Sequence, residues 1–165
     1  MSDAAPTPIH LATPGGAGEA EEQAKLEEFD IAGPLIGIVM GSASDMDAME
    51  KAAKELRERG IPHEMQVMSA HREADTVAEY AKSAKSRGLR VIIAGAGISA
   101  ALPGAVAAHT DLPVIGVPLS GRLTAAGGLD AILSIVQMPP GVPVACVGLD
   151  NARNAAILAA QILAA

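Results

Sequence analysis

The chain has 165 residues, half of them hydrophobic, and a formal net charge of −7 at pH 7; this length suits one domain with a substantial core. The negative charge argues against nucleic acid as a partner, because phosphate backbones are bound by basic surfaces. A single cysteine, Cys146, excludes an intramolecular disulfide framework and a multi-cysteine metal site, and it fits a reducing compartment.

The first part of the chain differs in composition from the rest. Residues 1–33 are rich in Pro, Gly and Ala and then in Glu, which predicts a flexible extension with at most one short helix in the acidic run. Residues 34–165 are expected to form one catalytic domain. No secretion signal is visible and no run reaches the roughly 18 apolar residues that span a bilayer, so we expect a cytoplasmic protein without membrane contact.

From Pro34 onward, short apolar runs alternate with segments of helical periodicity. Strands are predicted over 35–41, 61–68, 90–96, 112–118 and 142–149. Helices are predicted over 45–59, 73–87, 99–109, 129–137 and 151–163. Buried strands that alternate with helices are typical of an α/β fold, with a five-stranded parallel sheet covered by helices on both faces. Ligands of such sheets bind outside the carboxyl ends of the strands.

Three of the predicted strands are followed by segments that could form one site. The first of them, Gly41-Ser42-Ala43-Ser44-Asp45, offers backbone N–H groups and a helix N-terminus, which suit an anionic group. It lacks the Gly-Lys-Ser/Thr ending of a P-loop. Taken alone, this turn is more typical of a helix cap made by Ser44 or Asp45; Asp45 could also accept hydrogen bonds from ribose hydroxyls.

The second segment is Ser69-Ala70-His71-Arg72. The planar guanidinium of Arg72 suits bidentate phosphate binding, although a lone Arg is more often a solvated charge or a partner of Glu73 or Asp75. His71 can exchange a proton near neutral pH, whereas a lone His at a strand end is usually structural.

The third segment, Ala94-Gly95-Ala96-Gly97, is a weak dinucleotide signal because the third glycine of that fingerprint is missing. Its glycines could let a flat ring lie against the backbone, and a tight turn is an equally good reading. The loops over 119–128, which contains Arg122, and 137–143 could cover the same crevice or merely connect elements. His63 and His109 are read as structural, the latter as a helix cap, and no pair of side chains has convincing metal spacing.

Together, these segments resemble the catalytic component of phosphoribosylaminoimidazole carboxylase, the N5-carboxyaminoimidazole ribonucleotide mutase family of purine biosynthesis. The resemblance covers about residues 36–163. It is carried by the ordered set VMGSASD, SAHR, VIIAGAG, LPG, LPVIGVP, SIVQMPPGVPVA and NAAILAAQIL.

The resemblance implies a flavodoxin-like domain that assembles as a homo-octamer, binds a small ribonucleotide and uses no metal or organic cofactor. His71 would be the general acid and base. The ribose phosphate would be bound by Ser42, Asp45 and Arg72 with help from Ser44 and Ser69, and Gly95 and Gly97 would border the aminoimidazole ring. The strongly apolar last helix also predicts burial against another subunit.

Some positions depart from the family pattern. The mutases usually read AGAGGAAHLPG where this chain reads AGAGISAALPG, so Ala101 replaces a histidine, and Met46 replaces a tryptophan. Animal-type carboxylases, which use free carbon dioxide, typically have Lys in place of Arg72. Arg72 therefore favours the mutase, while Ile98 and Ala101 leave open a direct carboxylase. A non-catalytic nucleotide-binding module on the same fold is the third reading.

Overall fold

The computed structural model describes residues 33–165, so the extension predicted over 1–33 lies, apart from Gly33, outside the described residues. The strands are β1 (Ile36–Met40), β2 (His63–Val67), β3 (Val91–Gly97), β4 (Val114–Leu119) and β5 (Ala145–Cys146). The helices are η1 (Ala43–Asp45), α2 (Met46–Glu58), α3 (Ala74–Ala84), α4 (Leu102–Ala107), η2 (Ala126–Gly128), α5 (Leu129–Val136) and α6 (Ala152–Ala164). Every predicted strand and helix is present.

The five strands form one parallel sheet in the order β2-β1-β3-β4-β5. This confirms the predicted flavodoxin-like α/β fold. The chain leaves β1 toward β2 on one side and then crosses to β3 on the other, so the strand order reverses between β1 and β3. Ligands of doubly wound sheets bind at this reversal, outside the carboxyl ends of the strands.

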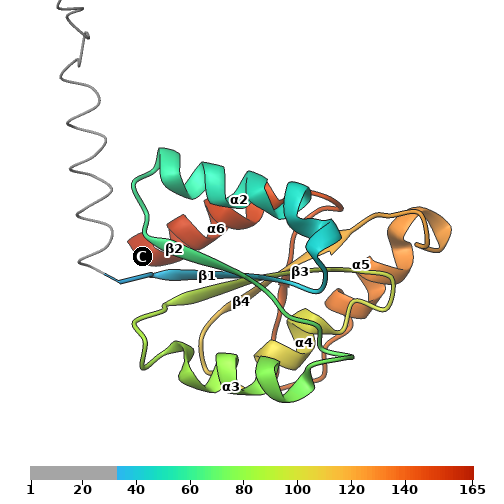
Figure 1. Cartoon of the computed structure of the whole chain (residues 1–165), viewed down its shortest axis with the longest axis horizontal. Coiled ribbons are helices and arrows are strands. Elements are labelled where there is room, and N and C mark those ends of the chain that lie inside the picture. Colours follow the sequence, from blue (N-terminus) through green and yellow to red (C-terminus); the bar gives the residue numbers. More distant parts are fainter. Residues whose placement is uncertain (1–32) are drawn as a thin grey trace, which may run out of the picture.

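Helices cover both faces of the sheet, with α2 and α6 on one side and α3 and α4 on the other (Figure 1). The core facing α2 and α6 contains Ile38, Ile93 and Ile115, all fully buried. The second core contains Val39, Ile92 and Ile135 of α5. Because strands buried on both faces need apolar residues at consecutive positions, these two cores explain the unbroken apolar runs of β1, β3 and β4.

Most elements are somewhat shorter than predicted, and two of the differences have a local cause in proline. The strand expected over 142–149 pairs only at Ala145 and Cys146, in a segment where Pro143 has no N–H to contribute to the ladder. The helix expected over 99–109 begins at Leu102. Pro103 lies in its first turn, the position that proline favours because no N–H is needed there.

The second strand is an edge strand, and the prediction that it is buried was wrong. β2 pairs with β1 alone, and Val67 near its end is 43% exposed. An edge strand such as β2 therefore needs apolar side chains only on the face that packs against the core. None of the helices within residues 33–165 combines the length and hydropathy that crossing a membrane requires.

One face of the C-terminal helix is covered within the chain, where its small residues Ala152, Ala155, Ala156 and Ala159 are fully buried in the core that α2 shares. Burial of its other face against another subunit stays a prediction. Larger apolar side chains are exposed on α5. Leu129, Leu133 and Val136 are 47%, 47% and 50% exposed and recur at helical spacing, so α5 presents an exposed apolar face in the described part of the chain.

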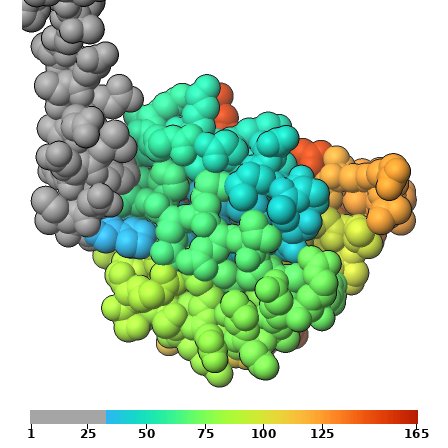
Figure 2. Space-filling view, in the orientation of Figure 1, coloured from blue at the N-terminus to red at the C-terminus, as the bar shows by residue number. Residues whose placement is uncertain are grey.

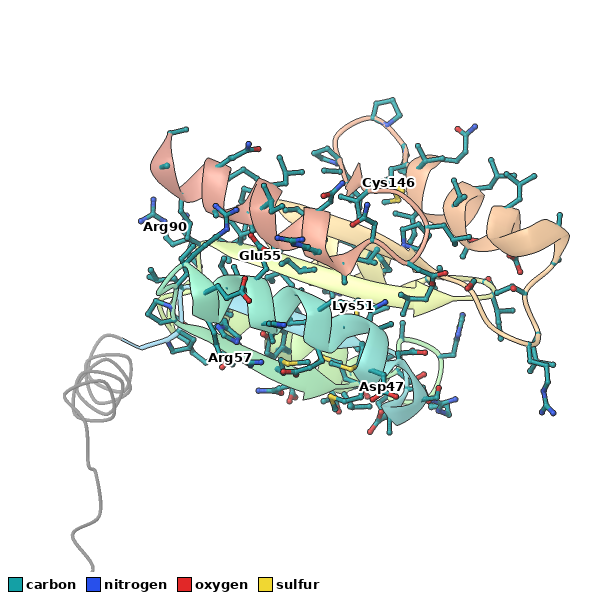
Figure 3. The ribbon with its side chains drawn as sticks, turned by 90° about the horizontal axis from the view of Figure 1, so that it is seen from above. Asp47, Lys51, Glu55, Arg57, Arg90 and Cys146 are labelled. Carbon is teal, nitrogen blue, oxygen red and sulfur yellow. The ribbon has the colours of Figure 1, made fainter. Side chains whose placement is uncertain are left out.

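An ion-pair cluster fastens α6 to α2. The carboxylate of Glu55, whose side chain is 6% exposed, accepts hydrogen bonds from Arg59 Nε at 2.8 Å and Arg153 Nε at 2.6 Å. Figure 3 shows Glu55 between the two helices. Both carboxylate oxygens are used, and the pKa of Glu55 is lowered first by the hydrogen bond from Arg153 and then by that from Arg59.

Candidate active site

A cavity of about 550 Å³ lies at the carboxyl ends of the strands, within the size range of small-molecule sites. Seven of the eight predicted site residues line it. They are Ser42, Ser44, Asp45, Ser69, His71, Arg72 and Gly97. The three segments singled out from the sequence therefore meet in one place, as the parallel sheet requires.

The turn after β1 is held by its own serines. Ser42 has an extended backbone, and its Oγ accepts hydrogen bonds from Ser44 N at 3.2 Å and Ser44 Oγ at 2.9 Å. Asp45 occupies the cap position of α2, but its carboxylate makes no capping hydrogen bond. Ser42, rather than Ser44 or Asp45, thus makes the side-chain cap here, and the Asp45 carboxylate is not used in starting the helix.

The environment of Asp45 raises the pKa of its carboxyl, because partial burial removes water from the charged form. The hydrogen bonds from the Ser44 side chain and the Ser42 backbone oppose this effect without cancelling it. Water therefore solvates an ionised Asp45 less well than it solvates a fully exposed carboxylate. Hydroxyl groups of a ligand would supply the donors that it lacks.

The turn after β2 is shaped by Glu73 and Arg72. The N–H of Ser69 donates to Glu73 Oε2 at 3.1 Å, and the Ser69 carbonyl accepts from the N–H groups of Arg72 and Glu73. Arg72 Nη2 donates to the carbonyl of Gly41 at 3.0 Å, a partner other than Glu73 or Asp75. His71 is exposed at this turn and lines the cavity, so its imidazole is available for proton transfer.

The two predicted glycines of β3 lie in different surroundings. A Cβ at Gly97 would lie 2.8 Å from the backbone oxygen of Leu119, at the wall of the cavity. Gly95 is not part of the cavity wall; a Cβ there would lie 2.4 Å from Met49 Sδ. The structure thus brings Gly97, but not Gly95, to the site, and Gly95 permits close packing of α2 on the sheet.

Two departures from the family pattern fall at the cavity, whereas Met46 is not part of its wall. Ile98 and Ala101 both line it. Ile98 has a φ of 58°, a left-handed conformation that glycine adopts freely and a β-branched residue disfavours. This explains the family's glycine at the position and means that the isoleucine is strained here, with its side chain 49% exposed.

Sequence reasoning missed part of the wall that follows β4. Ser120 and Thr124 line the cavity beside Arg122; only Arg122 was named from the sequence, in a loop that could cover the crevice, and the only signal for the other two was their place in that loop. In Figure 2, this segment belongs to the orange part that projects at the edge of the molecule. The other loop, 137–143, contributes no residue to the cavity wall.

The remaining histidines have structural contacts. His63 Nδ1 lies 2.9 Å from the carbonyl of Ile61, and His109 Nδ1 lies 2.9 Å from the carbonyl of Ala105 in the last turn of α4. The second contact is the helix-end interaction predicted for His109. Within the described residues, no group of three or more His, Cys, Asp or Glu side chains is arranged to hold a metal ion.

Comparison with known proteins agrees with this geometry. Residues 35–165 match the AIR carboxylase family. The N5-carboxyaminoimidazole ribonucleotide mutase of Pyrococcus horikoshii is 57% identical over 130 residues, which cover 79% of this chain and 72% of that protein. The phosphoribosylaminoimidazole carboxylase of Schizosaccharomyces pombe is 56% identical over 79% of this chain, but the match covers only 23% of that larger protein.

A solved structure is similar over the same region. The crystal structure of Treponema denticola PurE superposes with a TM-score of 0.69 and 37% sequence identity, covering 79% of this chain and 80% of that one.

Proposed function

Because the chain belongs to the AIR carboxylase family, we propose that its cavity converts N5-carboxyaminoimidazole ribonucleotide into 4-carboxy-5-aminoimidazole ribonucleotide. The chain is a mutase of purine biosynthesis, like its relatives from Pyrococcus and Bacillus subtilis. The observation that carries the proposal is the meeting of His71, Asp45, Arg72 and Gly97 around one cavity.

The ribose phosphate end of the substrate is assigned to the turns after β1 and β2. Arg72 retains guanidinium N–H groups beyond the one donated to Gly41, and a planar fork suits phosphate. The Ser42 hydroxyl, in contact with Ser44, lines the same wall. Ser44 and Ser69 add polar groups to the same wall, and the poorly solvated carboxylate of Asp45 binds the ribose hydroxyls.

His71 is assigned the proton transfers. Cleavage of the N5 carbamate returns the bonding electrons to N5 and releases carbon dioxide. The electron-rich ring then forms a bond from C4 to carbon dioxide, and the proton lost from C4 balances the proton gained at N5. A protonated His71 donates a proton to N5 as the carbamate is cleaved, and the neutral imidazole then accepts the proton lost from C4, which completes an isomerisation with no external reactant.

The proposal also requires that carbon dioxide remain beside the ring between the two steps. A walled cavity retains it long enough for capture, which converts a bimolecular step into an intramolecular one. Gly97 presents bare backbone toward the cavity, and a flat ring fits against such a surface. Gly95 lies outside the cavity wall, where it allows Met49 to pack closely.

Turnover of both substrates by the purified protein tests this function. We expect conversion of N5-carboxyaminoimidazole ribonucleotide without ATP or a partner enzyme, and little conversion of aminoimidazole ribonucleotide at ordinary bicarbonate. His71→Asn should lower kcat by at least about 100-fold, as expected for loss of a general acid and base, with substrate binding retained. Preference for aminoimidazole ribonucleotide and carbon dioxide would favour the direct carboxylase. Binding without turnover would favour the non-catalytic module.

We also propose that the chain acts as a homo-octamer in the cytoplasm. The support is the exposed apolar face of α5, made by Leu129, Leu133 and Val136, together with Leu123, which is 72% exposed at the rim of the cavity. Apolar side chains recurring along one helix face favour burial against another protein surface. Since Leu123 lines the cavity, a contact that includes it would lie next to the site.

A further inference from the structure

The cavity wall after β4 is fixed by a residue from a distant part of the chain. Asp150, which precedes α6, has a left-handed backbone with a φ of 56°, and its N–H donates to the carbonyl of Pro118 at 2.9 Å. Its Oδ1 accepts from the Ser120 N–H at 2.8 Å, and its Oδ2 accepts from Ser120 Oγ at 2.5 Å. Non-glycine residues keep such a conformation where the surroundings impose it, often at functional sites.

This arrangement determines what Ser120 offers to a ligand. A serine hydroxyl has one proton to donate and two lone pairs. The proton of Ser120 is committed to Asp150, so the hydroxyl can only accept hydrogen bonds from the cavity. Donation to a carboxylate also increases the electron density on the hydroxyl oxygen.

Hydrogen-bond donors lie on the other side of the sheet reversal. Arg72 keeps guanidinium N–H groups beyond the one donated to Gly41, and it lines the cavity together with the carboxylate of Asp45. β3 separates the two walls, since β1 and β4 are its neighbours. The guanidinium that suits a phosphate therefore lies after β2, and the hydroxyl of Ser120, which can only accept, lies after β4 near Arg122.

We propose that Ser120, held by Asp150, accepts a hydrogen bond from the N–H of the substrate nitrogen N5. The proposal rests on the proposed function, whose substrate carries acceptors at its phosphate end and an N–H donor at N5. Arg72 at the phosphate and Ser120 at N5 orient the molecule between them. Once the carbamate is cleaved, an N5 amino group whose N–H points at Ser120 within the ring plane keeps its lone pair conjugated with the ring, and this makes C4 nucleophilic. Ser120 is thus a substrate-binding residue and Asp150 a positioning residue.

The test uses the product, 4-carboxy-5-aminoimidazole ribonucleotide, and its analogue without the 5-amino group, both titrated into the purified protein by calorimetry. We expect the wild type to bind the amino compound about tenfold more tightly, the factor that one hydrogen bond of about 1.4 kcal/mol provides. Ser120→Ala should abolish this preference. Arg72→Gln should weaken both ligands equally and keep the ratio.

Asp150→Asn separates positioning from folding. The asparagine can still accept from the Ser120 N–H, but its amide donates toward Ser120 Oγ and releases the hydroxyl proton into the cavity. The amino preference should disappear with little change in Tm, and the double variant should show no further loss. Equal preference in wild type and both single variants overturns the proposal. Failure of the wild type to convert the substrate would instead overturn the proposed function, because the binding ratio is measured independently of turnover.

Discussion

The guanidinium of Arg72 donates a 3.0 Å hydrogen bond from Nη2 to the main-chain carbonyl of Gly41. This contact joins the turn that carries His71 to the turn that carries Asp45. Two loops from neighbouring parallel strands are thereby held at one spacing, although 31 positions separate the bonded residues in the chain. Arg72 therefore serves both the shape of the cavity and the charge within it.

Arg72→Lys tests these two roles together. Lysine keeps the charge but lacks the planar fork, so it cannot contact the Gly41 carbonyl and a phosphate in the same manner. We expect kcat/KM to fall roughly 10- to 100-fold, the effect of losing a charge-assisted hydrogen bond. The control is Arg90→Lys at the start of β3, because Arg90 lies outside the cavity wall and the same exchange there should leave kcat/KM unchanged. Equal effects at the two positions would contradict the assigned role.

Asp45→Asn should separate stability from binding. Burial raises the folded-state pKa of Asp45 above its ordinary value of 3.8, so at neutral pH the ionised carboxylate is less favourable in the folded chain than in the unfolded one. Removing the charge should therefore raise Tm slightly at pH 7, and the gain should vanish as the pH falls below 4. Affinity for the ribonucleotide should decrease about tenfold or more, because charged acceptors bind hydroxyls more strongly than amides do. Calorimetry measures both quantities, and a lower Tm at pH 7 would refute the assigned desolvation.

Ile98→Gly should relieve backbone strain. The left-handed conformation costs a non-glycine residue about 1–2 kcal/mol, and glycine loses about 0.5–1 kcal/mol through its greater freedom in the unfolded chain. The expected net gain is a few tenths of a kcal/mol to about 1 kcal/mol, seen by denaturant titration. Val67→Gly is the matched control, since Val67 is 43% exposed and has no positive φ; it should destabilise. A loss of stability at both positions would show that Ile98 is not strained.

The strands, the helices and part of the site could be predicted from the sequence, whereas the length of β5 could not. Alternating apolar runs predicted every strand and helix because a parallel sheet imposes that pattern on its buried strands. The strand-end rule then brought Asp45, His71 and Gly97 together without any knowledge of side-chain positions. The length of β5 was overestimated, because an apolar run does not show how many of its residues pair with the neighbouring strand.

Other features depend on contacts that no local pattern encodes. Ser120 could not be identified because its chemistry comes from Asp150, 30 positions later. A glycine that lets a ligand approach the backbone and a glycine that lets a helix pack closely look alike in a sequence. At Gly95 the structure shows the close packing, because an added Cβ would lie 2.4 Å from Met49 Sδ.

The α5 face offers a direct test of assembly. Leu133→Glu places a charge in the centre of the exposed apolar face, and burying it against another subunit would be strongly unfavourable. Light scattering should give an octamer for the wild type and smaller species for the variant, with an unchanged circular dichroism spectrum. The control is Thr76→Glu, at an exposed position of α3; this variant should remain octameric. A wild-type monomer would rule out the proposed assembly.

The Glu55 cluster predicts how stability responds to acid. Arg153 and then Arg59 hold the pKa of Glu55 below its ordinary value of 4.5 in the folded chain, so folding favours the ionised carboxylate. The stability this provides is complete above the unfolded-state pKa and is lost as the pH falls through the lower folded-state pKa. Glu55→Gln should therefore lower Tm most at pH 7, and the difference from wild type should shrink at pH values below 4.5. Glu58→Gln, at a side chain 55% exposed, should change Tm little at either pH. Thermal melts from pH 7 to below pH 4.5 test this prediction. A difference in Tm between wild type and Glu55→Gln that stayed constant with pH would mean that the cluster stabilises by packing rather than by charge.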